Sequence, residues 1–347
     1  MACRLPVRVL LLRERSKFGG INGNRVIGDD LASEIECLLS RYGRNPRGVV
    51  MVQTDSALRC LPCQDSEERA LTVKRMLNVS RDYARELGQS ALKAVADGAY
   101  VAPSGRRIDW REKIERAKTL KQSIRPDDAL PSTLRETFTQ TSVQVRNETT
   151  MQTAKSFVER GLHPLALNFA NGISPGGGFL HGARAQEEVL CRSSALFATL
   201  DGDPMYDFHS RRDAPDSTDW MILSADVPFF RDDDGTALDQ PWLLSVVSSA
   251  APYAPRLGQP RSGDLLARRI HRLLLVAAAY GYDVLVLGAW GCGAFGNDPV
   301  RTAQDFRRAL ERHFYGHFSE VVFAIADWSP ERQFLAPFRD EFSASSS

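Results

Sequence analysis

Two carboxylates and an amide follow a run of glycines at short range, and this is the strongest chemical signal in the chain. Gln186, Glu187 and Glu188 come seven residues after Gly176-Gly177-Gly178. Glycines let a main chain approach a ligand closely, and carboxylates can transfer protons. Neighbouring residues on a helix point about 100° apart, so these two acids cannot face each other across one bond. We expect one to reach a reacting bond and the other to orient the ligand.

Simpler interpretations exist for each half of this pattern. Acids in the first turn of a helix also occur because they complement the helix dipole. Three glycines alone are compatible with a flexible surface loop. The pairing of the two at this spacing favours a ligand site.

A second glycine-rich loop lies between a predicted strand at 283–287 and a helix predicted from Pro299. Its amides can wrap a diphosphate, and the helix N-terminus adds partial positive charge. No lysine and hydroxyl residue follow the glycines, so it is not a P-loop. Asp298 is expected to cap the helix. The candidate ligand residues are Gly291, Cys292, Gly293, Ala294, Phe295 and Gly296, although Cys292 and Phe295 are also plausible packing residues.

The elements around these loops alternate between strands and helices. We expect helices at 80–98, 110–120, 150–160, 186–200, 261–280 and 298–313, and strands at 143–145, 164–169, 220–224, 243–248, 283–287 and 320–325. This alternation predicts an α/β fold with helices on both faces of a mixed sheet. Both loops follow predicted strands, and ligands bind at the carboxyl ends of strands in such sheets.

Length and charge limit the partners. The 347 residues include 44 basic and 43 acidic side chains, so no net field favours nucleic-acid duplexes or membranes. No apolar stretch approaches the roughly 18 to 20 residues needed to span a bilayer. We expect a poorly ordered extension at 1–75, a helical lead-in packed on the catalytic domain at 76–135, a core at 136–335 and a frayed tail at 336–347.

The N-terminal extension and the cysteines bear on the compartment. The first 28 residues carry six basic side chains and one acid, Glu14. A basic leader is the preferred interpretation, and organelle import stays an alternative. Within the extension, a helix at 30–42 and a strand at 48–53 are expected. Cys60 and Cys63 have metal-site spacing but lack a second pair, so no metal is expected. The predicted protein is a monomer in the cytoplasm or nucleus.

Several of these motifs together resemble a known family. Pro175–Gly178, the Gln186–Glu188 triplet and Leu190–Ser194 resemble the signature of the bacterial-type poly(ADP-ribose) glycohydrolases of the macrodomain superfamily. Residues 100–107 and 167–171 are similar to that family as well, and the resemblance covers about 78–330. It implies a three-layer α/β/α macrodomain-like fold with a mixed central sheet, preceded by a helical N-terminal extension.

The resemblance also implies roles. Glu188 would be the general acid and then the general base, which requires a raised pKa, and Glu187 would fix the distal ribose. Asn171, Gln186, Gly176–Gly178 and Gly291–Gly296 would bind the ligand, with no cofactor. Phe229 or Phe230 would form the adenine side, whereas Asp232–Asp234 is expected to be a solvated turn. The substrate would be poly(ADP-ribose) or an ADP-ribosylated protein, in reversal of ADP-ribosylation and in the DNA damage response.

Two alternatives remain open at this point. One is a macrodomain that binds ADP-ribose without cutting it, although such a reader has no need of Gln186–Glu188. The other is a hydrolase of a different ADP-ribosyl bond, to a protein side chain, a nucleobase or an acetyl group. The sequence also leaves open whether cleavage starts at chain ends or internally.

Overall fold

The computed structural model describes residues 58–131 and 138–343. The basic leader and the expected helix at 30–42 and strand at 48–53 lie outside the described residues. Among the described ones, no helix has the length and apolar character needed to cross a membrane.

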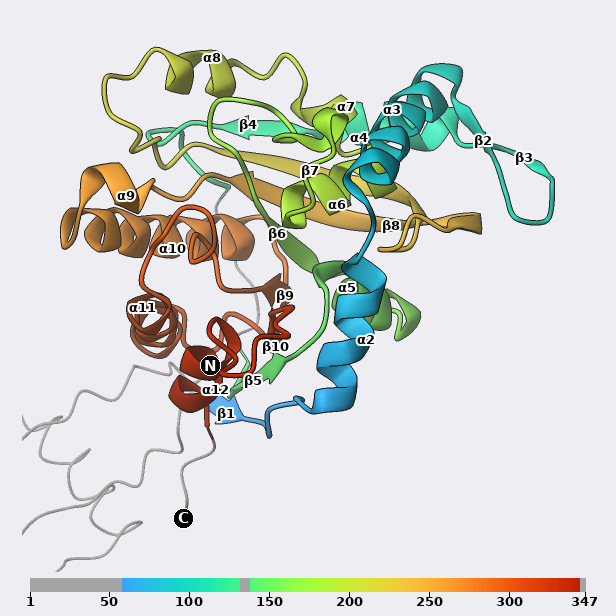
Figure 1. Ribbon diagram of the computed structural model, residues 1–347. Coiled ribbons are helices and arrows are strands. Elements are labelled where there is room, and N and C mark those ends of the chain that lie inside the picture. The colour runs from blue at the N-terminus through green and yellow to red at the C-terminus, as the bar shows by residue number, and fades with distance from the viewer. Residues whose placement is uncertain (1–57, 132–137, 344–347) are drawn as a thin grey trace, which may run out of the picture. The chain divides into compact units, whose positions relative to one another are not determined.

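An eight-stranded mixed sheet forms the centre, in the order β1-β5-β10-β9-β6-β8-β7-β4 (Figure 1). The strands from β1 to β8 in this order run parallel, and β7 and β4 are antiparallel to their neighbours. The bounds are β1 (Leu58–Cys60), β4 (Gln122–Ile124), β5 (Thr141–Arg146), β6 (Leu165–Phe169), β7 (Met221–Arg231), β8 (Ala237–Ser249), β9 (Val284–Leu287) and β10 (Glu320–Ala324). The predicted α/β class with a mixed central sheet is confirmed.

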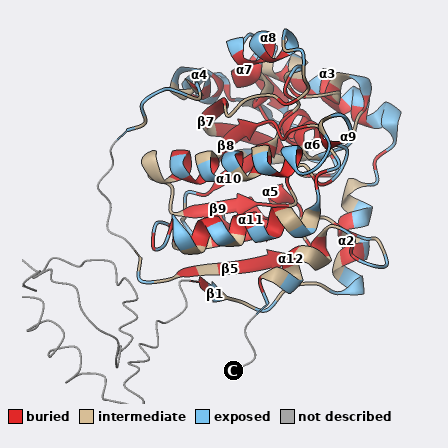
Figure 2. Cartoon of the chain, turned by 90° about the vertical axis from the view of Figure 1, so that its left-hand side faces the viewer, coloured by how far each residue is buried: buried red, intermediate tan, exposed pale blue. Residues whose placement is uncertain are grey.

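Helices cover both faces of this sheet. On one face, α10 (Arg261–Ala279), α11 (Pro299–Arg312) and α12 (Leu335–Glu341) share a core with the strands. On the other, α5 (Thr150–Glu159) and α6 (Gln186–Ser193) form a second core. Figure 2 shows the strands buried between helices whose outer sides are exposed. All of β9 is apolar and buried, as is usual for a parallel strand covered on both faces.

The lead-in packs on one end of the sheet. It comprises α3 (Arg81–Asp97), the hairpin β2 (Ala99–Val101) and β3 (Arg107–Asp109), and α4 (Arg111–Leu120), and it is preceded along the chain by α2 (Glu67–Leu77). Helix α3 ends at Gly98, which has a φ of 64°. Rings of Tyr100 and Trp110 contact Phe230 of β7, with centroid distances of 5.1 and 4.7 Å. Short helices α7 (Phe197–Leu200), α8 (Pro204–Ser210), α9 (Ala254–Leu257) and η1 (Phe179–His181) complete the chain.

The structure differs from the expected extension and tail at both ends. Residues 58–77, placed mostly in a poorly ordered extension, form β1, which pairs with β5, and α2, capped by Ser66. The tail is not frayed from 336, because α12 and the residue after it bury Phe338 and Phe342. Strand β1 and helix α12, with 3 and 7 residues, carry too few residues for a hydrophobic period to be recognised.

Two helix boundaries also differ. Thr149, rather than Thr150, caps α5, in a capping box with Gln152. The helix expected at 186–200 is interrupted at Ser194, whose extended backbone forms a bridge with Phe229. A long-range backbone contact of this kind has no local sequence signal.

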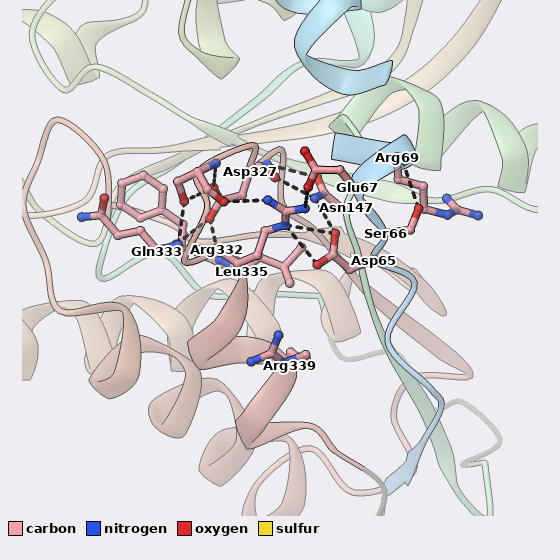
Figure 3. Close-up of polar contacts among 12 residues, drawn as sticks. Asp65, Ser66, Glu67, Arg69, Asn147, Asp327, Arg332, Gln333, Leu335 and Arg339 are labelled. Carbon is pink, nitrogen blue, oxygen red and sulfur yellow. Dashed lines mark hydrogen bonds and ion pairs between the residues drawn. The ribbon is translucent and has the colours of Figure 1, made fainter. Parts of the chain in front are cut away.

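A polar network ties the segment before α2 to the loop before α12 (Figure 3). Arg332 donates to Asp65 at 3.1 Å and to Glu67 at 3.0 Å. Asn147 donates to the carboxylate of Asp65 at 2.8 Å and to the carbonyl of Asp327 at 2.7 Å. The network therefore holds residues 325–335, which form one wall of a cavity described below.

Candidate active site

The two glycine-rich loops leave neighbouring strands at the same edge of the sheet. Strands β6 and β9 are parallel, with Leu165 opposite Leu285. A cavity of about 290 Å³ lies between the loops. It is lined by Phe169, Ala170, Asn171, Ala185, Gln186, Glu187, Glu188, Ala251, Ala289, Trp290, Gly291, Gly293, Ala294 and Phe295. Residues more than 100 positions apart in the sequence thus face one space.

Glu188 lines this cavity and has one carboxylate oxygen without a hydrogen-bond partner among the described residues. Its side chain is only 8% exposed, and Oε1 accepts a hydrogen bond of 2.9 Å from the amide of Gly178. Oε2 is buried and has no hydrogen-bond partner within residues 58–131 and 138–343. A carboxylate held at one oxygen and free at the other is suited to proton transfer with a ligand.

Gly177 makes room for this carboxylate. Its φ is 58°, and a Cβ added there would lie 2.3 Å from Oε1 of Glu188 and 3.0 Å from Oε2 of Glu187. Gly176 has a φ of 69° and lies against the Phe179 ring. None of Gly176–Gly178 is among the described residues that line the cavity, and the run lies instead against the side chains of Phe179, Glu187 and Glu188.

Glu187 is held more tightly than Glu188. It is 3% exposed, and Oε2 accepts a 2.7 Å hydrogen bond from the amide of Asn171. Asn168 donates to Oε1 at 3.3 Å and to Ser248 at 3.0 Å. Burial raises the pKa of Glu187 to about 8, with the charge of Glu188 adding to the shift and these hydrogen bonds opposing it.

This raised pKa predicts a loss of stability in alkali. Protonated Glu187 adds to the free energy of unfolding. This contribution is complete below pH 4.5 and is lost as pH rises through about 8. We expect the thermal midpoint to fall by about 5 °C between pH 6 and pH 9. Differential scanning fluorimetry of wild type and Glu187→Gln would measure it. The glutamine variant, neutral at every pH, should show a smaller fall, and equal slopes in both proteins would contradict the assignment.

Gln186 and Asn171 shape the site as well as line it. Gln186 accepts from the amide of Phe169 at 2.9 Å and donates to the carbonyl of Leu167 at 2.7 Å, which fixes the start of α6 on β6. The Asn171 oxygen accepts from the amides of Ile173 and Ser174 at 2.9 and 3.0 Å. A ligand would therefore contact Nδ2 of Asn171.

Asn297 organises the second loop. Its Nδ2 donates to the carbonyls of Pro252 and Gly291 at 2.8 and 3.1 Å, and its Oδ1 accepts from Ser262. Gly291 has a φ of 76°, and an added Cβ would lie 2.7 Å from that of Ala251. Asp298 caps α11 as predicted, accepting from the amide of Val300 at 2.9 Å.

The remaining candidate residues of this loop divide into those that line the cavity and those that do not. Gly291, Gly293, Ala294 and Phe295 line the cavity, and the Phe295 ring meets that of Tyr253 edge-on. Cys292 is 5% exposed, and Gly296 has a φ of 64°. Neither is among the described lining residues: Cys292 is buried within the loop, whereas Gly296 is exposed and lies against Pro255.

Sequence reasoning missed Asn168 and Asn297. Both are buried amides, and a buried amide needs hydrogen-bond partners. Asn168 interrupts the otherwise apolar run of β6, and that polar residue in a buried strand was the available signal. Asn297 had no comparable signal, because its partners come from three separate segments.

A second cavity of about 340 Å³ adjoins the first. The two share Phe169, Ala185, Gln186, Ala289 and Gly293. The second is lined mainly by apolar side chains, among them Leu77, Met151, Val189, Leu190, Ile325, Trp328 and Phe334. Glu148, Arg184 and Asp233 are its charged members. Trp328 and Phe334 come from the loop that the Arg332 network holds.

Two expectations about neighbouring residues were wrong. Phe229 and Phe230 do not line either cavity, because both are fully buried: Phe229 stacks on Trp242 at 4.9 Å, and Phe230 packs under the lead-in. Asp233 is not in a solvated turn. It is 3% exposed, accepts from Thr149 at 2.8 Å, and burial raises its pKa to about 6.

Comparisons with known proteins agree with this geometry. The family model "microbial-type PARG, catalytic domain" matches residues 88–232. The crystal structure of poly(ADP-ribose) glycohydrolase (PARG) from Thermomonospora curvata is 35% identical, with 75% of this chain and 99% of that chain covered and a TM-score of 0.70. Its complex with the inhibitor ADP-HPD is 36% identical over the same shares, with a TM-score of 0.69.

A second bacterial enzyme is similarly related. PARG from Deinococcus radiodurans in complex with ADP-ribose is 36% identical, with 66% of this chain and 96% of that chain covered and a TM-score of 0.61. A search of curated proteins found no match. The near-complete coverage of these relatives at such identity shows that the chain belongs to the microbial-type poly(ADP-ribose) glycohydrolase family.

Proposed function

We propose that Glu188 is the general acid–base with which this glycohydrolase breaks ribose–ribose O-glycosidic bonds of poly(ADP-ribose) and releases ADP-ribose. Family membership supports the glycoside hydrolase reaction. The observation that carries the assignment of Glu188 is its geometry. The residue lines the cavity, one of its oxygens is fixed by the amide of Gly178, and the other is buried without a hydrogen-bond partner among the described residues.

The proposed reaction uses this one carboxyl group twice. Protonated Glu188 gives its proton to the departing ribose oxygen while the glycosidic bond breaks and positive charge develops on the distal ribose. The resulting carboxylate then removes a proton from water, whose oxygen bonds to the anomeric carbon. Glu187 is assigned to the hydroxyls of the distal ribose, because its two oxygens are held in place by Asn171 and Asn168.

The two adjoining cavities suit the two ends of ADP-ribose. The cavity with the acids would take the distal ribose, with the diphosphate along the amides of 291–295 and near the N-terminus of α11. The larger apolar cavity would take the adenine, since Trp328 and Phe334 offer faces to a flat base. Its carboxylates, Glu148 and Asp233, offer acceptors to an exocyclic amine.

Some finer features belong to the same proposal. One of them is a monomer as the active species. Near-zero net charge argues against binding to nucleic-acid duplexes. The proposed catalytic core is 136–335, with the lead-in 76–135 packed on it through Tyr100 and Trp110.

Release of ADP-ribose from purified poly(ADP-ribose) tests the function. The products are separated by chromatography, and mono-ADP-ribosylated protein is treated in parallel. We expect free ADP-ribose from the polymer. Release from the mono-ADP-ribosylated protein alone would indicate another linkage, and tight calorimetric binding of ADP-ribose without release would indicate a reader.

A further inference from the structure

His209, in α8, contacts the turn that leads into the glycine run, although it does not line either cavity. Its Nδ1 lies 3.1 Å from the carbonyl oxygen of Gly172. Its Nε2 lies 2.7 Å from the hydroxyl of Thr218 and accepts from the amide of Thr218 at 3.1 Å. The imidazole therefore joins the catalytic loop to the segment that follows α8.

These partners determine the tautomer. A backbone N–H can only donate, so Nε2 must be the acceptor. A carbonyl can only accept, so Nδ1 must carry the proton and donate to Gly172. The functional form of His209 is the neutral Nδ1–H imidazole, because a proton on Nε2 would face the Thr218 amide.

The environment favours this neutral form. His209 is 4% exposed, and burial lowers its pKa to about 4, with the charges of Arg269 and Arg212 acting in the same direction. The hydrogen bond to the Gly172 carbonyl and the charge of Asp216 oppose this shift, and Asp216 is paired with Arg212 at 2.8 Å. Arg269 comes from α10, whereas Arg212 and Asp216 belong to the segment after α8.

The bond to Gly172 fixes one peptide unit at both of its polar atoms. The carbonyl of Gly172 accepts from His209, and the amide of the same unit, on Ile173, donates to Oδ1 of Asn171. The amide of Asn171 in turn donates to Glu187. An added Cβ at Gly172 would lie 2.4 Å from Oγ of Ser217, so the same segment also packs closely on this turn.

We propose that His209 is a positioning residue for the glycohydrolase reaction. Through the Gly172 carbonyl it holds the turn whose Asn171 amide orients Glu187 and whose continuation carries Gly177 and Gly178 beneath Glu188. It makes no contact with the reacting atoms. The proposal rests on the proposed function, because the rate it affects is that of ADP-ribose release.

Two substitutions separate the two contacts of the imidazole. In His209→Asn the side-chain amide nitrogen takes approximately the place of Nδ1 and can still donate to Gly172. In His209→Gln the side-chain oxygen takes approximately the place of Nε2 and can accept from Thr218, but the donor to Gly172 is lost. Purified full-length variants are compared by kcat, KM and thermal midpoint on poly(ADP-ribose).

We expect His209→Gln to lower kcat by about 10- to 100-fold with KM within about threefold, as for a misplaced catalytic group. His209→Asn should keep kcat within about threefold of wild type. Equal losses in both variants, or a loss in His209→Asn alone, would show that the histidine only holds the segment after α8. Unchanged kcat in both would also overturn the proposal.

Two further outcomes also distinguish the proposal from its alternatives. If His209→Gln does not fold, His209→Asn carries the result, and a tenfold loss of kcat in that folded variant overturns the proposal. Wild-type protein without activity in the same assay would instead refute the proposed function.

Discussion

Glu188→Gln is expected to lower kcat for ADP-ribose release by about 10²- to 10⁴-fold, the range typical of a lost general acid–base. The glutamine oxygen can still accept from the amide of Gly178, so the side chain should keep its place. Its amide, however, cannot supply a proton to the leaving oxygen or accept one from water. Affinity for ADP-ribose should stay within about threefold, because the shape of the cavity is unchanged.

Chromatographic assay of ADP-ribose and calorimetric binding would measure the two quantities on the same preparations. The matched control is Glu112→Gln, which removes an exposed glutamate from the first turn of α4, as Glu188 lies in the first turn of α6. That variant should retain wild-type kcat. If Glu188→Gln kept more than a tenth of the wild-type rate, the proton donor would have to be sought elsewhere, with Glu187 the first candidate.

Gly177→Ala is expected to be nearly as damaging, although it removes no functional group. The added methyl group would lie 2.3 Å from Oε1 of Glu188, and the φ of 58° is unfavourable for alanine. Either the loop or the carboxylate must move. Because displacement of a catalytic group by about 1 Å can cost about 100-fold, we expect kcat to fall by about two orders of magnitude.

The second loop provides a matched control for this change. Gly293 also lines the site, but an added Cβ there would meet no atom within 4 Å, and its φ is not in the left-handed region. Gly293→Ala should therefore keep kcat within about threefold, with any effect seen in KM. Similar losses in the two alanine variants would mean that the loops respond to reduced flexibility rather than to the contact with Glu188.

Local patterns in the sequence were sufficient for much of the fold and for the acids. Helices α3, α4, α5, α10 and α11 repeat their apolar residues at helical spacing, and a buried strand such as β9 is a continuous apolar run. The glycine run and Gln186–Glu188 lie within 13 residues, so their proximity is a property of the chain itself. The α/β alternation then implied that loops after β6 and β9 share one edge.

Contacts between distant segments determined the remaining features of the fold and the site. Such contacts leave little signal in the local sequence. Asn297 is recognisable as a structural amide only when its partner Pro252 is seen beside it, and the partners of Asn168, Glu187 and Ser248, also come from other elements. The sequence predicts a ligand contact for Phe229 or Phe230, yet these rings pack against Trp242 and Trp110 and line neither cavity. Strand β1 forms because it pairs with β5 at the edge of the sheet.

The sequence by itself thus determined which residues could do the chemistry, since glycine and carboxylate spacing acts over a few covalent bonds. Only the tertiary structure decided how they are held. The burial that raises the pKa of Glu187, the unpartnered oxygen of Glu188 and the bond from His209 to Gly172 all depend on segments brought together by the sheet. Desolvation and hydrogen-bond geometry are properties of that three-dimensional packing, and spacing along the chain does not encode them directly.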